Sequence, residues 1–199
     1  MAREFWDQRY SHDKQTYGAT ENDFLREVVP RLPRGPALCL GAGEGRNAVF
    51  LAHHLGPVTA VDQSAVGLEK AAQLAKSRGV ELRTRTADLM ELPFGDGWSV
   101  ITSIWAHVPP PVRARVHSEV LGALAPGGAY VVESYTPAQV GRGTGGPPNA
   151  ALTTDLAELK AQLPGLEFVI AREIERDVQE GNFHNGLSSV VQLLAIKPA

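Results

Sequence analysis

Short apolar runs of strand length alternate along the chain with longer segments whose apolar residues recur at helical spacing. The runs predict strands, and the segments between the first five predict crossover helices. The predicted strands are Ala37–Leu40, Val58–Asp62, Glu81–Asp88, Trp98–Ala106, Ala129–Tyr135, Phe168–Asp177 and Leu187–Ile196. The predicted helices are Asn22–Arg31, Arg46–Leu55, Ala65–Arg78, Pro111–Leu124 and Thr153–Leu163. This alternation favours a parallel sheet covered by helices on both faces.

The last two predicted strands, Phe168–Asp177 and Leu187–Ile196, are separated by a loop that contains EGNFHNG. No crossover helix fits in that loop, so the two strands are expected to form an antiparallel hairpin. The whole pattern predicts an α/β fold. It is a single doubly wound, mostly parallel seven-stranded sheet of Rossmann-like form, with an antiparallel C-terminal hairpin. Two helix starts are marked by capping residues, one by Ser64 and one by Thr153 or Thr154.

Length and composition indicate one globular domain over residues 1–199. The net charge is −3 and the pI is about 6.1, so no broad attraction to nucleic acid or to an anionic membrane is expected. The single cysteine, Cys39, and the absence of an apolar signal core favour a cytoplasmic protein. No apolar run approaches the ~20 residues of a membrane span. No C-x-x-C or H-E-x-x-H spacing predicts a metal site.

The clearest chemical signal is a glycine-rich turn between the first predicted strand and its helix, in LCLGAGEGRN. Gly41, Gly43 and Gly45 let the backbone turn sharply and approach a ligand without a Cβ in the way. The helix that follows offers unpaired N–H groups. Asp62 ends the next strand, where its carboxylate can accept hydrogen bonds from both ribose hydroxyls of a nucleoside. The other cofactor-binding candidates here are Ala42, Asn47 and Gln63.

Two kinds of cofactor suit this strand–turn–helix–strand–Asp unit. Dinucleotide enzymes favour G-x-G-x-x-G, in which the helix start faces a pyrophosphate. Here the spacing is G-x-G-x-G, and Arg46 stands where the dinucleotide pattern wants its third glycine. S-adenosylmethionine has no phosphate, and a tighter turn suits its amino acid end. The spacing therefore favours S-adenosylmethionine over a nicotinamide dinucleotide.

Two later stretches supply further cofactor-binding candidates. Asp88 ends the third predicted strand, in TADLMELPF, where its carboxylate can accept from an adenine amino group, and Leu89 follows it. The alternative role for Asp88 is to cap a turn or helix. Trp105 ends the fourth predicted strand and is expected to form a wall of the cofactor site, with core packing as the alternative.

Four motifs, LCLGAGEG, AVD, TADLMELPF and LAPGG, resemble those of class I S-adenosylmethionine-dependent methyltransferases in order and spacing, over about residues 22–135. Four further stretches resemble a bacterial subgroup similar to tellurite-resistance and thiopurine methyltransferases: FWDQRY…YGATENDFL, HVPPPVR, GTGGPP and REIERDVQEGNFHNG. The resemblance implies S-adenosylmethionine as cofactor and S-adenosylhomocysteine as product. It implies a lid or helix at 1–35, a cofactor-binding core at 36–135 and an acceptor side at 136–199.

The segment Phe5–Gly18 is rich in aromatic residues and arginine. By resemblance, Trp6, Arg9 and Tyr17 are expected to fold over the cofactor and exclude water. Arg9 is the candidate partner of the cofactor's carboxylate, because a guanidinium matches paired carboxylate oxygens. The alternative for the segment is a helix packed under the sheet.

Candidate catalytic residues follow the later strands, because ligands of open α/β sheets sit beyond the carboxyl ends of the strands. His107 follows the fourth strand and is a candidate base or orienting donor, with a loop-capping histidine as the alternative. Glu133 and Tyr135 lie at the end of the fifth predicted strand and are candidates to face the acceptor. Glu180 and His184 are expected on the loop of the terminal hairpin, beside the acceptor or simply within the turn.

The expected function is methyl transfer from S-adenosylmethionine to a small-molecule acceptor. That acceptor would be a thiol, a chalcogen oxyanion such as tellurite or selenite, or a similar xenobiotic or metabolite. One alternative is a pseudo-enzyme or regulatory module that binds S-adenosylmethionine without turnover, and another is a nicotinamide-dependent oxidoreductase. The need for a general base, the role of the Gly141–Ala151 loop as lid or linker, and a monomeric or homodimeric state all stay open.

Overall fold

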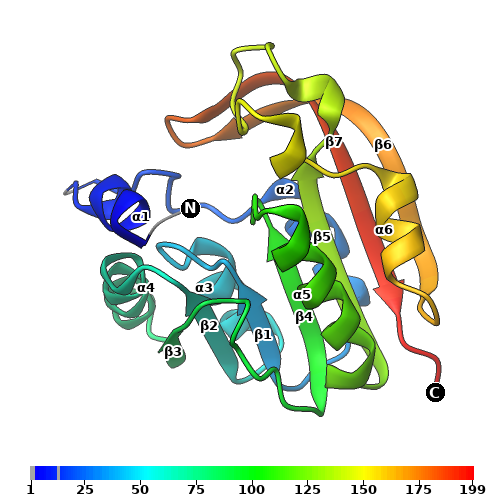
Figure 1. The fold of residues 1–199 in the computed structure, drawn as a ribbon. Coiled ribbons are helices and arrows are strands. Elements are labelled where there is room, and N and C mark those ends of the chain that lie inside the picture. Colours follow the sequence, from blue (N-terminus) through cyan, green and yellow to red (C-terminus); the bar gives the residue numbers. More distant parts are fainter. Residues whose placement is uncertain (1–2, 13) are drawn as a thin grey trace.

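The computed structural model describes residues 3–12 and 14–199 of the chain. One seven-stranded sheet runs through the molecule in the order β3-β2-β1-β4-β5-β7-β6 (Figure 1). The strands are β1 Ala37–Leu40, β2 Val58–Asp62, β3 Leu82–Thr86, β4 Trp98–Ile104, β5 Leu124–Tyr135, β6 Glu167–Glu180 and β7 His184–Ile196. The strands β1 to β5 pair in parallel, and β7 is antiparallel to both of its neighbours. The predicted doubly wound sheet with a reversed terminal hairpin is confirmed.

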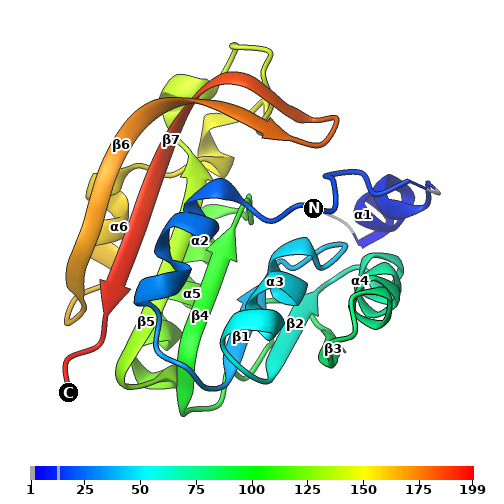
Figure 2. The ribbon, with the colours of Figure 1, turned by 180° about the vertical axis from the view of Figure 1, so that it is seen from behind.

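Helices cover both faces of the sheet (Figures 1 and 2). They are α1 Arg3–Tyr10, α2 Asp23–Val28, α3 Arg46–His54, α4 Ala65–Ser77, α5 Pro110–Ala123 and α6 Leu156–Gln162. Short 3-10 turns span Val29–Arg31, Pro137–Gln139 and Ala150–Leu152. None of the helices among the described residues is both long and apolar enough to cross a bilayer.

The alternation of side chains along each strand divides the core into two layers. Leu38 and Leu40 of β1 pack with α5 and α6 on one face. Ala37 and Cys39 of the same strand pack with α2, α3 and α4 on the other. Since β1 is buried on both sides, its sequence is a continuous apolar run, as expected for a central parallel strand.

Helix starts follow from side chains that satisfy free backbone N–H groups. The Ser64 hydroxyl accepts from the Gly67 N–H at 3.1 Å, as predicted, and starts α4. The prediction that Thr153 or Thr154 caps the last helix is wrong. Asp155 caps α6, accepting from the Glu158 N–H at 2.8 Å, because a carboxylate is the stronger acceptor for that N–H group.

The bounds of β3 to β7 also differ from the prediction: β3 ends at Thr86, before Asp88, and β4 ends at Ile104, before Trp105. The expected hairpin loop shrinks to residues 181–183, because β6 and β7 stay paired up to Glu180 opposite His184. These two side chains are therefore buried strand-end residues rather than loop residues. At the other end of the sheet, β5 begins at Leu124, which pairs with Trp98 before the turn at Gly127.

Candidate active site

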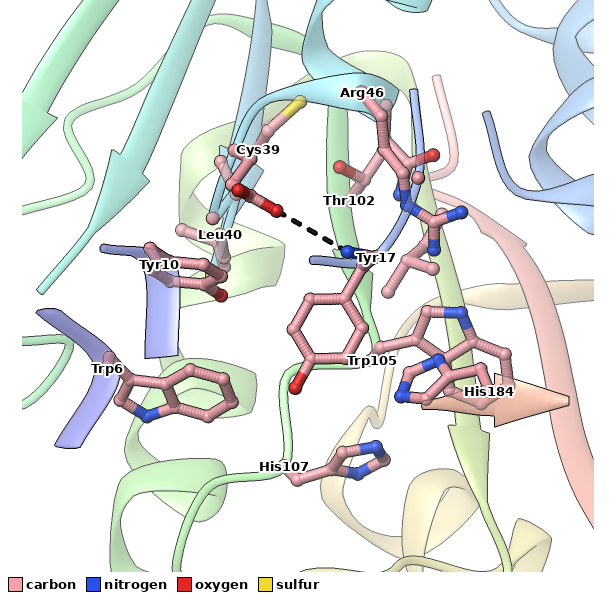
Figure 3. Close-up of a pocket in the computed structure, with 17 residues that line it drawn as sticks. Trp6, Tyr10, Tyr17, Cys39, Leu40, Arg46, Thr102, Trp105, His107 and His184 are labelled. Atoms are coloured by element: carbon pink, nitrogen blue, oxygen red, sulfur yellow. Dashed lines mark hydrogen bonds between the residues drawn. The ribbon is translucent and has the colours of Figure 1, made fainter. Parts of the chain in front are cut away.

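The candidate site lies at the carboxyl ends of the central strands, where α1 and the tip of the β6–β7 hairpin approach the sheet (Figures 1 and 3). Three adjoining cavities lie there. The turn cavity borders the glycine turn and Asn47. The Asp62 cavity borders Asp62 and Asp88. The hairpin cavity lies between α1, residues 143–148 and the hairpin tip at Phe183.

The turn and Asp62 cavities adjoin each other. Both are lined by Trp6, Tyr10, Gly41, Trp105 and His107. The hairpin cavity meets the turn cavity at a junction lined by Trp6, Tyr17, His107 and His184. The structure therefore brings together, around these adjoining cavities, candidates that lie far apart in the sequence.

The three glycines of the turn are required by their backbone conformation and by the close approach of neighbouring residues. Gly41, Gly43 and Gly45 have φ values of +63°, +52° and +86°, in the region that favours glycine. A Cβ on Gly45 would lie 2.4 Å from the Cβ of Ala71, so this glycine lets α3 approach α4. A Cβ on Gly41 would lie 3.0 Å from that of Ala106, at the wall shared by the two cavities.

Asp62 joins the glycine turn to the end of β2. Its Oδ2 accepts from the Gly43 N–H at 2.8 Å, and its Oδ1 accepts from the Ser64 N–H at 2.9 Å. Burial raises the pKa of Asp62, and these N–H groups partly oppose the rise. Each carboxylate oxygen has a second lone pair, so Asp62 can still accept from a ligand in the cavity that it lines.

The far end of the Asp62 cavity is lined by Gln63, Asp88 and Leu89, as expected from the sequence. Oδ1 of Asp88 accepts from the Met90 N–H at 2.8 Å, so this carboxylate also holds its own turn. The turn-capping role and the ligand-binding role predicted as alternatives for Asp88 are therefore compatible.

Trp105 is the residue under the most backbone strain at the site. Its φ of +57° is the only positive value outside glycine among the described residues. A bulky residue in this region costs of the order of 1–3 kcal/mol, and such strain gathers at functional sites. Its ring stacks on Tyr135 with centroids 4.5 Å apart, and its indole N–H donates to Glu180 Oε2 at 2.8 Å. Trp105 thus forms a fixed wall of both the turn cavity and the Asp62 cavity.

Two histidines meet at the junction of the turn and hairpin cavities (Figure 3). The rings of His107 and His184 lie 6.4 Å apart between centroids, and each lies against Tyr135. Both ring nitrogens of His107 and Nδ1 of His184 are buried without a hydrogen-bond partner among the described residues. Burial lowers the pKa of His107 to about 4 and that of His184 to about 3. Both rings are therefore neutral at pH 7, with polar atoms free for a ligand.

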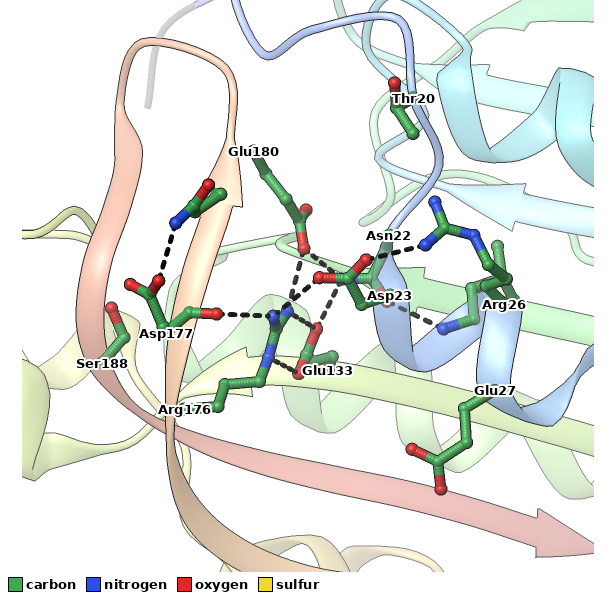
Figure 4. Close-up of polar contacts among 12 residues, drawn as sticks. Thr20, Asn22, Asp23, Arg26, Glu27, Glu133, Arg176, Asp177, Glu180 and Ser188 are labelled. Atoms are coloured by element: carbon green, nitrogen blue, oxygen red, sulfur yellow. Dashed lines mark hydrogen bonds and ion pairs between the residues drawn. The ribbon is translucent and has the colours of Figure 1, made fainter.

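Beside the cavities lies a buried cluster of charged and amide side chains, which we call the ion network (Figure 4). Its members are Asn22, Arg46, Glu133, Arg176, Glu180 and Gln192. Nη2 of Arg176 lies 2.8 Å from both Glu133 Oε2 and Glu180 Oε1. Arg46 pairs with the other oxygen of Glu180. Two carboxylates and two guanidinium groups thus balance one another, as buried charges require.

Contacts within the ion network hold the side chains of Glu133 and Glu180 in position. The side chain of Glu180 is only 3% exposed, and each of its oxygens accepts from nitrogens of the network or of Trp105. Burial raises the pKa of Glu180, but Arg46, Trp105 and Arg176 outweigh it and leave that pKa below its ordinary value. Neither glutamate lines the three cavities. The structure places both carboxylates behind Trp105 rather than in the space for an acceptor.

The N-terminal segment covers the glycine turn. Tyr10 is buried against Gly43 and Gly67, and its ring stacks on Trp6 at 5.5 Å. The Glu44 carboxylate accepts from the Thr16 N–H at 2.7 Å and so fastens the segment to the turn. Of the alternatives drawn from the sequence, this position over the site agrees with a cover and not with a helix under the sheet.

Arg9 lies on the side of α1 that faces away from the turn cavity and the Asp62 cavity. Its guanidinium carbon sits 4.3 Å from the ring centroid of Phe183 and 5.2 Å from that of Phe5. It lines the hairpin cavity and neither of the other two. The arginine that lines the turn cavity is Arg46, at the first position of α3.

Sequence reasoning missed three residues that build this site: Asn22, Glu44 and Arg46. Glu44 and Arg46 lie inside the glycine motif, in GEGR, where charged residues flank a turn that ends in a buried helix start. Their position in this motif was the sequence signal that could have identified Glu44 and Arg46 as site residues. Asn22 also caps α2, but its contacts with Glu133 and Glu180 join it to residues more than 100 positions away in the chain, which no local pattern marks.

Comparison with known proteins agrees with this geometry. Residues 37–128 match a family model described as a methyltransferase domain. Over 70 residues, the chain is 40% identical to the uncharacterized methyltransferase YodH of Bacillus subtilis (strain 168). That match covers 35% of this chain and 30% of YodH, so the chain spans less than a third of this curated relative.

Two solved structures share the fold. The N-methyltransferase NodS from Bradyrhizobium japonicum WM9, in complex with S-adenosylhomocysteine, superposes with a TM-score of 0.73. It is 17% identical, over 99% of this chain and 98% of that one. TehB from Haemophilus influenzae superposes with a TM-score of 0.74 at 14% identity, over 98% of this chain and 66% of that one. At these identities the likeness concerns the fold alone.

The order of the strands, the glycine turn with Asp62 and the domain match agree on one assignment. The cradle of glycines beside two adjoining cavities fits S-adenosylmethionine. Residues 37–128 match a methyltransferase domain, and the fold is that of the class I S-adenosylmethionine-dependent methyltransferases.

Proposed function

We propose that this protein transfers a methyl group from S-adenosylmethionine to a small-molecule acceptor. The observation that carries the proposal is the junction of the cavities. Two adjoining cavities lie past the glycine turn and Asp62, and a third cavity meets the first of them at His107 and His184. A cofactor in the first two cavities and an acceptor in the third would meet at that junction.

The proposed division of the single domain follows the cavities. In the core, residues 36–135, Asp62 would hold the ribose hydroxyls. Asp88 and Leu89 would flank the adenine, and the glycine turn with Asn47 would hold the amino acid end. Residues 1–35 would form the cover, and residues 136–199 would form the acceptor side.

The bound sulfonium supplies an activated methyl group, so the protein's contribution is alignment and exclusion of water. Orientation of two reactants can supply ~7–11 kcal/mol of a barrier. Trp6 and Tyr17 would exclude water from the junction, and Trp105 would keep the wall fixed. His107 and His184 would orient the acceptor through their free ring nitrogens.

The neutrality of the junction limits the class of acceptor. A histidine whose pKa is about 4 is a weak base, and no carboxylate of the described chain lines the hairpin cavity. A hydroxyl acceptor needs a base or a metal. A thiolate, a selenide or another soft nucleophile needs neither. This supports thiols, chalcogen oxyanions and similar xenobiotics or metabolites as acceptors. A cytoplasmic location and the lack of a nucleic-acid partner are further parts of the proposal.

Calorimetric titration with S-adenosylhomocysteine, after removal of any copurified ligand, tests the first half of the proposal. We expect micromolar binding and no binding of NAD. Binding at about 100 times the dissociation constant should stabilise the fold by ~2.7 kcal/mol, which a melting scan checks.

Turnover tests the second half. Release of S-adenosylhomocysteine should accompany methylation of an acceptor from a panel of thiols, selenite and tellurite. Binding without turnover on any acceptor would favour the regulatory module instead. Binding of NAD alone would favour an oxidoreductase.

A further inference from the structure

Arg9 is a positive charge built into the wall of the hairpin cavity. It lies on α1 one helical turn after Phe5, and its guanidinium lies over the rings of both Phe5 and Phe183. Phe183 belongs to the hairpin tip, so the arginine bridges the two elements that enclose the cavity. A guanidinium held against aromatic faces keeps its edge free for further hydrogen bonds.

No carboxylate neutralises this charge within the described chain. Arg46, Arg142 and Arg176 each pair with a glutamate. Among residues 3–12 and 14–199, no ion pair involves Arg9. Its polar neighbour is the hydroxyl of Tyr17, where Arg9 opposes the rise that burial causes in the Tyr17 pKa. Most of the five donors of the guanidinium therefore stay available.

The rest of the cavity wall is aromatic or uncharged at neutral pH. Aromatic side chains come from α1, from Tyr17 and from the hairpin tip, and a glycine-rich segment at residues 143–146 closes the other side. Phe5 and Phe183 are 43% and 46% exposed, so both present apolar ring surface at this space. Arg9 is the one formally charged side chain among the described residues that line it.

We propose that Arg9 is a specificity-determining residue that binds the anionic group of a planar aromatic acceptor. The acceptor's ring would pack against Phe183 and Tyr17, and its nucleophile would point to the junction at His107 and His184. A carboxylate matches the guanidinium edge with two parallel hydrogen bonds, and aromatic faces favour a flat partner. This inference rests on the proposed function, because it assigns the hairpin cavity to the acceptor.

Two inert probes of the same shape test the inference without assuming a nucleophile: 2-naphthoate and 2-naphthamide. Each is titrated by calorimetry into the full chain saturated with S-adenosylhomocysteine. We expect the carboxylate to bind at least about tenfold more tightly than the amide. Arg9→Gln should abolish that difference by weakening the carboxylate alone. Arg9→Lys should restore part of it, since it keeps the charge but not the planar fork.

Arg3→Gln is the matched control, because it removes an arginine from the same helix but outside the cavity. It should leave the preference for the carboxylate intact. Equal affinity of the two probes, no binding of either, or an unchanged preference in Arg9→Gln would each overturn the inference. Because S-adenosylhomocysteine is titrated first in every variant, failure of the proposed function shows itself separately as loss of that binding, and the inference falls with it.

Discussion

The indole N–H of Trp105 donates to Oε2 of Glu180 at 2.8 Å, across 75 positions of the sequence. Trp105 directly follows β4 and Glu180 ends β6, so this contact joins the wall of the turn and Asp62 cavities to the terminal hairpin. The left-handed backbone of Trp105 is costly and persists only where its surroundings over-determine it. Glu180 is one such constraint, and its own position depends on Arg46 and Arg176.

Glu180→Gln should therefore destabilise the protein strongly. The substitution leaves the buried Arg46 without the carboxylate it pairs with and leaves Arg176 with Glu133 and the exposed Asp23, and breaking one partner of a buried pair costs about 3–5 kcal/mol. The free energy of unfolding, measured in urea, should fall by that order. Glu175→Gln, which removes the exposed partner of Arg142, should cost at most about 1 kcal/mol. Equal losses in the two variants would contradict the central position of Glu180 in the ion network.

Asp62→Ala should weaken binding of S-adenosylhomocysteine by ~1.5–3 kcal/mol, the range for lost hydrogen bonds to a charged group. Calorimetry gives the affinity, and a melting scan separates it from stability, because Asp62 also holds the Gly43 and Ser64 N–H groups. Asp96→Ala removes an exposed carboxylate from the loop before β4 and should change neither quantity. An unchanged affinity in Asp62→Ala would refute the ribose assignment.

His107→Ala should leave the affinity for S-adenosylhomocysteine nearly intact and lower turnover once an acceptor is known. The reason is its place at the junction, with both ring nitrogens free. Calorimetry and initial rates distinguish the two effects, and the exposed His53→Ala serves as control. Loss of binding without a kinetic defect would assign His107 to the cofactor instead.

Stability should fall on mild acidification because of the two junction histidines. Their folded-state pKa values, about 4 and about 3, lie below the ordinary value of 6.5. Below pH 6.5 the unfolded chain therefore binds more protons than the folded chain. The contribution of the two neutral rings to the free energy of unfolding is complete above pH 6.5 and is lost as the pH falls towards 4 and 3. Urea midpoints at pH 7.5 and 4.5 should differ less in the His107→Gln/His184→Gln double variant than in the native chain. His53→Gln should behave like the native chain, and an unchanged pH dependence in the double variant would contradict burial of the neutral rings.

The local pattern of apolar residues was enough to predict the strands of the sheet, and β1 and β2 were predicted with the bounds that the structure shows. The hairpin ends were not predictable in the same way. The polar residues of EGNFHNG are typical of a turn, and only the buried partners of Glu180 and His184 extend the pairing. Likewise, the ion network joins Asn22 to Glu133 and Glu180, and no local pattern carries such a distant pairing.

The misplaced expectation for Arg9 has a simple geometric origin. On a helix, residues four apart share a side. Trp6 and Tyr10 form one such pair and face the glycine turn, whereas Phe5 and Arg9 form the next and face the hairpin. The aromatic character of α1 predicted a cover over the site, but the choice between its two sides depends on how the helix is rotated against α4.

The antiparallel hairpin has a consequence for engineering. Its tip contributes Phe183 and His184 to the hairpin cavity and nothing to the Asp62 cavity, and His184 also lines the turn cavity. Under the proposed function, an exchange of the tip that keeps His184 would change the acceptor side and leave the lining of the other two cavities unchanged. The ion pairs of β6 limit the segment that can be exchanged. A replacement β6 without Arg176 or Glu180 would leave the charged side chains that pair with these residues without partners, so the exchanged segment should begin after Glu180.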